Sequence, residues 1–229
     1  MAEIIVALDH STGEEALALV DVLGSGGDFY KVGPGLFSRE GPRIVESLLK
    51  REKRVFLDLK LHDIPNTVAG SVIAVRELGV DFLTIHTMGG IPMMKAAAEA
   101  AGDALTLLGV TVLTSMAVSD IEVVWDRNSV SLLDESVRLA RIAKESGLDG
   151  VVASPSEAGQ LKRLVGSGLL IVTPGIRLEG DDCDDQVRFA TPAYASEAGS
   201  DYLVVGRSIT RALDPAAALS LVCGEAKRP

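Results

Sequence analysis

The sequence is poor in cysteine and has no long apolar run, and both shortages exclude classes of protein. Its two cysteines, Cys183 and Cys223, are too few for a disulfide-stabilised scaffold and fit a reducing compartment. No stretch approaches the roughly 18 to 20 apolar residues that span a bilayer, so we expect no membrane segment. The chain begins MAEIIVALDHS, where Glu3 and a short apolar run argue against a signal peptide. These absences predict a cytoplasmic protein.

Positive charge is also in short supply, with 22 Lys and Arg against 32 Asp and Glu and a formal net charge of −10. Nonspecific nucleic-acid affinity depends on basic residues that neutralise phosphates, so we expect no nucleic-acid partner. A single phosphate group could still bind, because a few backbone N–H groups and one arginine are sufficient. The content of 47% hydrophobic and 24% charged residues is that of an ordinary globular protein.

Short β-branched apolar runs recur along the whole chain, and each is followed by a segment of helical periodicity. Nearly every position in these runs is apolar, which is typical of parallel strands buried on both faces. Such βα units, with no linker between them, predict a single (β/α)8 TIM-barrel domain over residues 1–229. The alternative, a doubly wound open sheet, usually has only about five or six units. The expected strands are 4–8, 29–32, 55–60, 82–86, 107–114, 150–154, 169–173 and 202–206.

Charged residues stand at the end of the third predicted strand, where a barrel has its active site. Asp58 and Lys60 are two positions apart, so their side chains share one face of an extended strand. Asp63 follows in the next loop, and Asp9 and Lys31 end the two preceding strands. A structural ion pair that caps the strand is one interpretation. Charges of alternating sign on adjacent strands favour a catalytic network instead.

A second group of residues, nearer the C-terminus, is typical of a phosphate site. Arg177 ends the sequence PGIR after the seventh predicted strand, and Gly206 and Arg207 follow the eighth. The loops after these two strands form the phosphate-binding corner of many barrels. Glycine lets the backbone approach an anion, a helix N-terminus offers N–H donors, and arginine supplies charge. We therefore predict that a phosphate group binds here.

The sequence DLKLHDIPNT, from Asp58 to Thr67, resembles the signature of the orotidine 5′-phosphate decarboxylase family. The segments ALD (7–9), KVG (31–33), TVLTSM (111–116), VTPGIR (172–177) and VGR (205–207) occur in the family's order, so the resemblance covers nearly the whole chain. It implies a carboxy-lyase of pyrimidine biosynthesis that converts orotidine 5′-monophosphate to UMP and CO2. The resemblance also implies a homodimer with active sites at the subunit interface, and no metal or organic cofactor.

The resemblance further implies roles for individual residues. Lys31, Asp58 and Lys60 would form a charged tetrad with Asp63 of the other subunit, and Lys60 would protonate C6 of the pyrimidine. The remaining substrate contacts would be Asp9 and Lys31 at the ribose, Thr67 across the interface, Thr114 at the base, and Arg177, Gln186, Gly206 and Arg207 at the phosphate.

Two alternatives stay open at this point. A magnesium-dependent sugar-phosphate decarboxylase or synthase shares the Asp-x-Lys-x-x-Asp motif, but has a glutamate ligand where this chain has Lys31, and a cation there would repel the metal. A catalytically silent phosphate-ligand binder would not need two aspartates that face an anionic substrate.

The acidic run 179–185 lacks the spacing of a calcium loop, so we predict no metal site. His62 and His86 are predicted to be structural.

Overall fold

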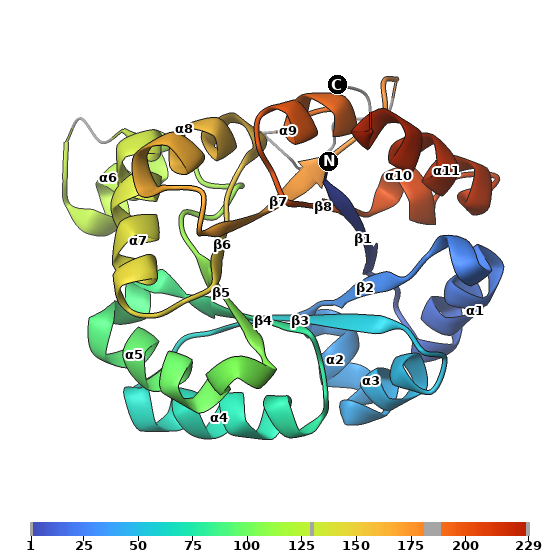
Figure 1. Ribbon diagram of the computed structural model, residues 1–229, viewed down its shortest axis with the longest axis horizontal. Coiled ribbons are helices and arrows are strands. Elements are labelled where there is room, and N and C mark those ends of the chain that lie inside the picture. Colours follow the sequence, from blue (N-terminus) through green and yellow to red (C-terminus); the bar gives the residue numbers. More distant parts are fainter. Residues whose placement is uncertain (1, 129–130, 181–188, 228–229) are drawn as a thin grey trace.

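The computed structural model describes residues 2–128, 131–180 and 189–227. This part of the chain is built around eight parallel strands. They are β1 (Glu3–Leu8), β2 (Phe29–Val32), β3 (Arg54–Leu61), β4 (Phe82–His86), β5 (Thr106–Val110), β6 (Gly150–Val152), β7 (Leu170–Ile176) and β8 (Tyr202–Val205). Each strand pairs with its neighbours in sequence order, and β8 pairs with β1 to close the sheet (Figure 1). The predicted (β/α)8 barrel is confirmed.

Helices cover the outside of the barrel (Figure 1). Several begin at a polar cap, as where Thr12 Oγ1 accepts the Glu15 N–H at 3.2 Å and Asp214 Oδ1 accepts the Ala217 N–H at 3.0 Å. None of the described helices is long and apolar enough to cross a bilayer. Their bounds are α1 Gly13–Leu23, α2 Pro34–Glu40, α3 Pro42–Leu49, α4 Pro65–Glu77, α5 Gly90–Ala101, α6 Val118–Trp125, α7 Leu132–Glu145, α8 Pro155–Val165, α9 Pro192–Glu197, α10 Arg207–Thr210 and α11 Pro215–Ala226.

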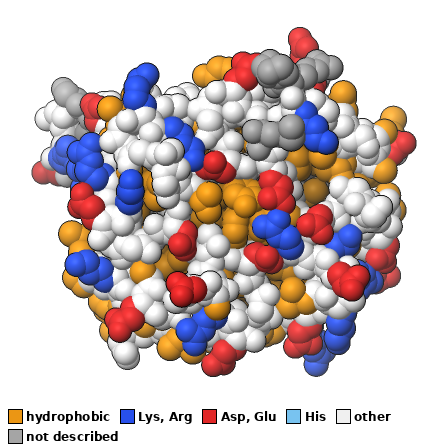
Figure 2. All heavy atoms as spheres, viewed as in Figure 1, with side chains coloured by type: hydrophobic (Ala, Val, Ile, Leu, Met, Phe, Trp, Pro, Cys, Tyr) orange, Lys and Arg blue, Asp and Glu red, His pale blue; other side chains and the backbone are white. Residues whose placement is uncertain are grey.

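The strands bury apolar side chains on both faces, as their composition predicts. Alternate residues point outward and pack under the helices, for example Leu57 and Leu83. The residues between them fill the barrel, where Phe29 and Phe82 meet edge to face with ring centroids 5.0 Å apart. Seen along the barrel, apolar side chains occupy the centre of the face, and charged side chains of both signs lie around them (Figure 2). The barrel is therefore a packed core rather than a channel.

The amino end of the barrel is closed by a charged cluster around Arg54. Its Nε lies 3.3 Å from Asp81 Oδ1, and its Nη1 forms an ion pair with Glu3. The guanidinium carbon lies 4.1 Å from the centroid of the Phe29 ring, a cation–π contact. Asp81 Oδ2 also accepts the Val55 N–H at 2.9 Å. This cluster ties strand β3 to its neighbours.

The fifth strand is shorter than predicted, and the expected span 107–114 is wrong at its carboxyl end. The strand stops at Val110, and the residues after it form a loop that leads to α6. Val112 is buried in a separate cluster with Ile121 and Leu139 beneath that loop. Its apolar character therefore reflects packing of the loop, which periodicity alone does not distinguish from a strand.

The strands β6, β7 and β8 also end at other residues than predicted. Strand β7 continues to Ile176, although Pro174 and Gly175 are typical of a turn. Its pairing with β8 is irregular between Thr173 and Ile176, and Gly175 has φ +82°, a conformation that glycine adopts readily. Strand β6 stops at Val152 and β8 at Val205, because helices α8 and α10 begin soon after them.

Candidate active site

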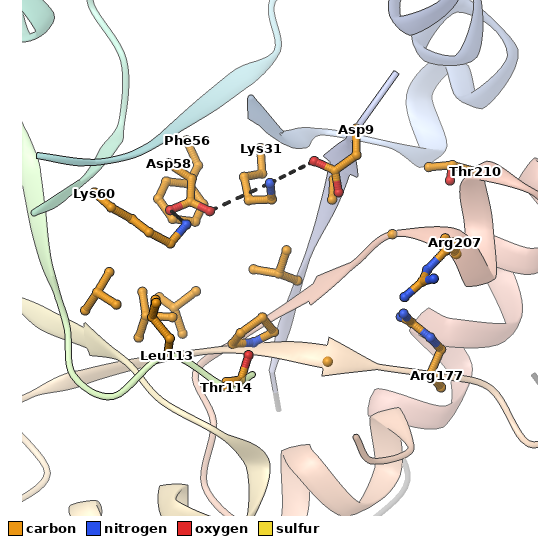
Figure 3. Close-up of a pocket in the computed structure, with 18 of the residues that line it drawn as sticks. Asp9, Lys31, Phe56, Asp58, Lys60, Leu113, Thr114, Arg177, Arg207 and Thr210 are labelled. Carbon is orange, nitrogen blue, oxygen red and sulfur yellow. Dashed lines mark hydrogen bonds and ion pairs between the residues drawn. The ribbon is translucent and has the colours of Figure 1, made fainter. Parts of the chain in front are cut away.

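A cavity of about 430 Å³ opens at the carboxyl ends of the strands, where a barrel of this kind holds its active site (Figure 3). Charged side chains from β2, from β3 and from Asp9, directly after β1, line one side, and arginines that follow β7 and β8 line the other (Figure 3). Apolar side chains also line the cavity. They are Ala7, Phe56, Val110, Val112, Leu113, Val152, Val172, Pro174 and Val204.

The charged side is a row of four groups with alternating sign. Lys31 Nζ lies 3.1 Å from Asp9 Oδ1 and 3.7 Å from Asp58 Oδ2. Asp58 Oδ1 in turn accepts a hydrogen bond from Lys60 Nζ at 2.8 Å (Figure 3). The structure thus brings together Asp9, Lys31, Asp58 and Lys60, which sequence position alone had suggested as neighbours.

The middle of this row is withdrawn from solvent. The side chains of Lys31 and Asp58 are 11% and 13% exposed, against 68% for Asp9. Burial by itself raises the pKa of Asp58, but the charges of Lys31 and Lys60 and the hydrogen bonds to its carboxylate outweigh burial. The pKa of Asp58 is therefore lowered, and the group is a carboxylate at neutral pH.

Lys60 reaches the cavity from an unusual backbone conformation. Its φ of 51° lies in the left-handed region, where a residue other than glycine costs about 1–3 kcal/mol. The pairing of β3 with β4 is irregular between Leu57 and Leu61, so Lys60 lies within a break in the ladder. As the two-residue alternation of a strand predicts, Leu57 and Leu59 pack toward the helices, while Asp58 and Lys60 line the cavity.

Two arginines lie on the opposite side of the cavity. Arg177 follows β7 and is buried, with 6% of its surface exposed, and its backbone N–H donates to the Ala190 carbonyl at 2.9 Å. Arg207 begins α10 directly after Gly206. Their guanidinium groups point toward one another (Figure 3). Two cations directed at one space suit an anion with several oxygens, such as a phosphate.

Thr114 also lines the cavity, but from the loop after β5 rather than from a strand end. Sequence analysis missed Thr210 and Arg211, which also line the cavity. Arg211 lies four residues after Arg207, directly after the last residue of α10, and this helical spacing was the available signal. Gln186, predicted at the phosphate, lies outside the described residues.

Asp63 and Thr67 do not line the cavity of their own chain. Both are exposed, and Asp63 Oδ1 accepts the Ile64 N–H at 2.6 Å. Asp63 instead borders a separate hollow with His62, Ile64, Pro65, Met88 and Gly89. A single chain therefore presents three members of the predicted tetrad in one cavity and the fourth on its surface.

The two predicted structural histidines stack beside this hollow, with ring centroids 5.4 Å apart and planes inclined by 19°. His86 Nδ1 accepts the Met88 N–H at 3.3 Å. Burial lowers the pKa of His86, and the nearby charges of His62 and Lys60 lower it further. His86 is therefore neutral at pH 7.

Within the described residues, no three His, Cys, Asp or Glu side chains converge on a position that could hold a metal ion. The space between the Asp9 and Asp58 carboxylates is taken by the Lys31 ammonium group. This geometry disfavours a magnesium site at the charged row, since an ammonium group in contact with both carboxylates repels a divalent cation.

Comparison with known proteins agrees with this geometry. Residues 2–222 match the family described as Orotidine 5′-phosphate decarboxylase / HUMPS family. An orotidine 5′-phosphate decarboxylase from Sodalis glossinidius is 47% identical over 226 residues, 97% of this chain and 89% of that protein. One from Shewanella sediminis is 48% identical over 223 residues, 96% of this chain and 94% of that protein. The crystal structure of orotidine 5′-phosphate decarboxylase from Lactobacillus acidophilus has a TM-score of 0.87 and 38% identity, with 100% of both chains covered.

Proposed function

The chain belongs to the orotidine 5′-phosphate decarboxylase / HUMPS family and converts orotidine 5′-monophosphate to UMP and CO2, and we propose that Lys60 supplies the proton for this reaction. The observation that carries the proposal is the alternating row of charges that faces two arginines across one cavity. The arginines bind the phosphate, the row receives the ribose and the pyrimidine, and Lys60 lies at the pyrimidine end.

Loss of CO2 leaves an electron pair on C6 of the pyrimidine, with no adjacent carbonyl to accept it. The site must therefore supply fixed positive charge where negative charge develops. The Lys60 ammonium group does so and then transfers its proton to C6, so the C6–carboxylate bond is replaced by a C6–H bond. CO2 leaves neutral, and Lys60 becomes an amine that takes up a proton from water before the next turnover.

Asp58 keeps this proton donor in place. Its carboxylate oxygen Oδ1 accepts a hydrogen bond from Lys60 Nζ at 2.8 Å, and this contact holds the ammonium group at the pyrimidine end of the row. Lys31 holds the other carboxylate oxygen and contacts Asp9, which binds the ribose hydroxyls. Arg177 and Arg207 with Gly206 bind the phosphate, and Gln186 joins them as the resemblance implies. Thr114 contacts the base.

We also propose that the enzyme is a cytoplasmic homodimer without a nucleic-acid partner, in which Asp63 and Thr67 complete the site of the other subunit. Asp63 is exposed outside its own cavity, and its neighbours Ile64 and Met88 are 67% and 38% exposed. An exposed carboxylate beside exposed apolar side chains fits a contact between subunits. The excess of ten acidic residues supports the absence of a nucleic-acid partner.

The test is the loss of orotidine 5′-monophosphate absorbance in the presence of purified protein and EDTA. We expect full turnover with the chelator, and no turnover in a Lys31→Glu variant. Activity that EDTA abolishes and Mg²⁺ restores would instead favour the metal-dependent sugar-phosphate enzymes. Binding of UMP without any turnover would favour a phosphate-ligand binder.

A further inference from the structure

Thr84 stands at the break in the ladder between β3 and β4. Leu57 pairs with Leu83, and the next pair along the strands is Leu61 with Ile85. Three residues of β3 therefore face a single residue of β4, which is Thr84. Backbone groups of β3 within the break need partners from outside the regular ladder.

The Thr84 hydroxyl makes two hydrogen bonds in this break. Its Oγ1 accepts a hydrogen bond from the backbone N–H of Lys60 at 2.9 Å. The same hydroxyl donates a hydrogen bond to Asp58 Oδ1, also at 2.9 Å. The direction of both bonds is fixed, because an amide can only donate and a carboxylate can only accept. Thr84 is fully buried, so water does not compete for either bond.

These two bonds act on two groups of the charged row at once. The first holds the Lys60 amide while its backbone adopts φ 51°, from which Nζ reaches Asp58 Oδ1 at 2.8 Å. The second fixes the plane of the Asp58 carboxylate, so that Oδ1 faces Lys60 and Oδ2 faces Lys31 at 3.7 Å. One hydroxyl therefore holds both the backbone conformation of Lys60 and the rotation of the Asp58 carboxylate.

We propose that Thr84 is a positioning residue for the decarboxylation, and this inference rests on the proposed role of Lys60. Thr84 touches no reacting atom. It holds the Lys60 ammonium group at the orientation that transfers its proton to C6. Without the hydroxyl, the Lys60 amide loses its partner and the carboxylate is free to rotate away from one of the two lysines.

The same hydroxyl contributes to the charge of Asp58. Burial raises the pKa of this carboxyl, the charges of Lys31 and Lys60 lower it, and hydrogen bonds from Lys60 and Thr84 lower it further. Loss of the Thr84 bond therefore raises the pKa of Asp58. A purely structural threonine would not change the titration of this group.

Thr87 offers a matched control. It is also buried, it follows the end of β4 directly, and its hydroxyl donates to the Val110 carbonyl at 2.8 Å. Replacement of either threonine by valine removes one buried hydroxyl at nearly constant volume. The two variants differ in that only the Thr84 hydroxyl contacts the charged row.

The experiment measures kcat, KM and the kcat–pH profile with orotidine 5′-monophosphate for wild type, Thr84→Val, Thr84→Ser and Thr87→Val. We expect Thr84→Val to lower kcat about 10- to 100-fold, the cost of a misplaced catalytic group. KM changes little, because the arginines that bind the phosphate are untouched. The acidic limb of the profile moves to higher pH. Thr84→Ser restores most of kcat, and Thr87→Val stays within about twofold of wild type.

A Thr84→Val variant that matches Thr87→Val in kcat and pH profile would overturn the inference. If Thr84→Val does not fold, the comparison of Thr84→Ser with Thr84→Ala decides in the same way, because only serine keeps the hydroxyl. A wild-type protein that binds UMP but does not turn over the substrate contradicts the proposed function instead.

Discussion

Two cations in this barrel each contact two carboxylates, at opposite ends of the same sheet. At the amino end, Arg54 pairs with Glu3 and Asp81. At the carboxyl end, Lys31 pairs with Asp9 and Asp58. In sequence both are basic residues next to or within buried strands. Their surroundings differ, and the difference separates a structural cluster from the row that we propose to be catalytic.

The amino-end cluster is hydrogen-bonded to the main chain and packs against an aromatic ring. Asp81 accepts a backbone N–H from Val55, and the Arg54 guanidinium lies over the Phe29 ring. The carboxyl-end row borders a cavity, holds a lysine with φ 51°, and is bonded side chain to side chain. Strain at an open cavity is retained where a function requires it, whereas backbone anchoring closes the end of a sheet.

The strongest test of this contrast removes Lys60, the proposed proton donor. Lys60→Ala should lower kcat by about 10⁴-fold or more, because it removes both the general acid and a fixed charge. Lys162→Ala is the matched control, since Lys162 Nζ also contacts an aspartate, Asp201, at 2.6 Å, away from the cavity. The control should keep kcat within about twofold. UMP should still bind to Lys60→Ala, and a folded Lys60→Ala enzyme with substantial kcat would remove Lys60 from the mechanism.

A subunit-mixing experiment tests whether the row is completed by a second chain. Lys60→Ala and Asp63→Ala dimers should each be inactive. After random exchange half the dimers are mixed, and each mixed dimer has one site with both lesions and one with neither. About a quarter of wild-type activity should therefore return. Activity that stays at the sum of the two parents, with exchange confirmed by mass spectrometry, would place Asp63 in its own subunit.

A smaller effect concerns the stacked histidines. Burial and the nearby charges of His62 and Lys60 lower the pKa of His86 below 6.5, its value in an unfolded chain. Below about pH 6.5 the unfolded chain therefore binds more protons than the folded one, and the free energy of unfolding falls as the pH drops. In urea titrations, the free energy of unfolding of His86→Asn should fall less between pH 7.5 and pH 5.5 than that of the wild type. An equal pH dependence of the free energy of unfolding in variant and wild type would refute the lowered pKa of His86 as its cause.

Periodicity predicted where the strands lie, because each apolar run is buried on both faces. It failed at the ends of β5 and β7, where Val112 packs under a loop and Gly175 continues a strand through an irregular pairing. The two-residue alternation of strand side chains also placed Asp58 and Lys60 on one face. It could not predict the left-handed Lys60 or the bonds of Thr84, because these depend on the pairing of two strands that are distant in sequence. The proposed contact of Asp63 with a second chain is likewise beyond the pattern of a single sequence.

The most direct test of the contrast compares Lys31→Met with Arg54→Met, each of which leaves two carboxylates without their shared cation. Arg54→Met should lower the free energy of unfolding by about 1 kcal/mol, since its pairs are partly exposed, and keep kcat within about twofold. Lys31→Met should lower kcat by about 10³-fold or more, since the charged row loses its central cation. Equal losses of kcat in the two variants, measured on folded enzyme well below either melting temperature, would contradict the division between the two ends of the barrel.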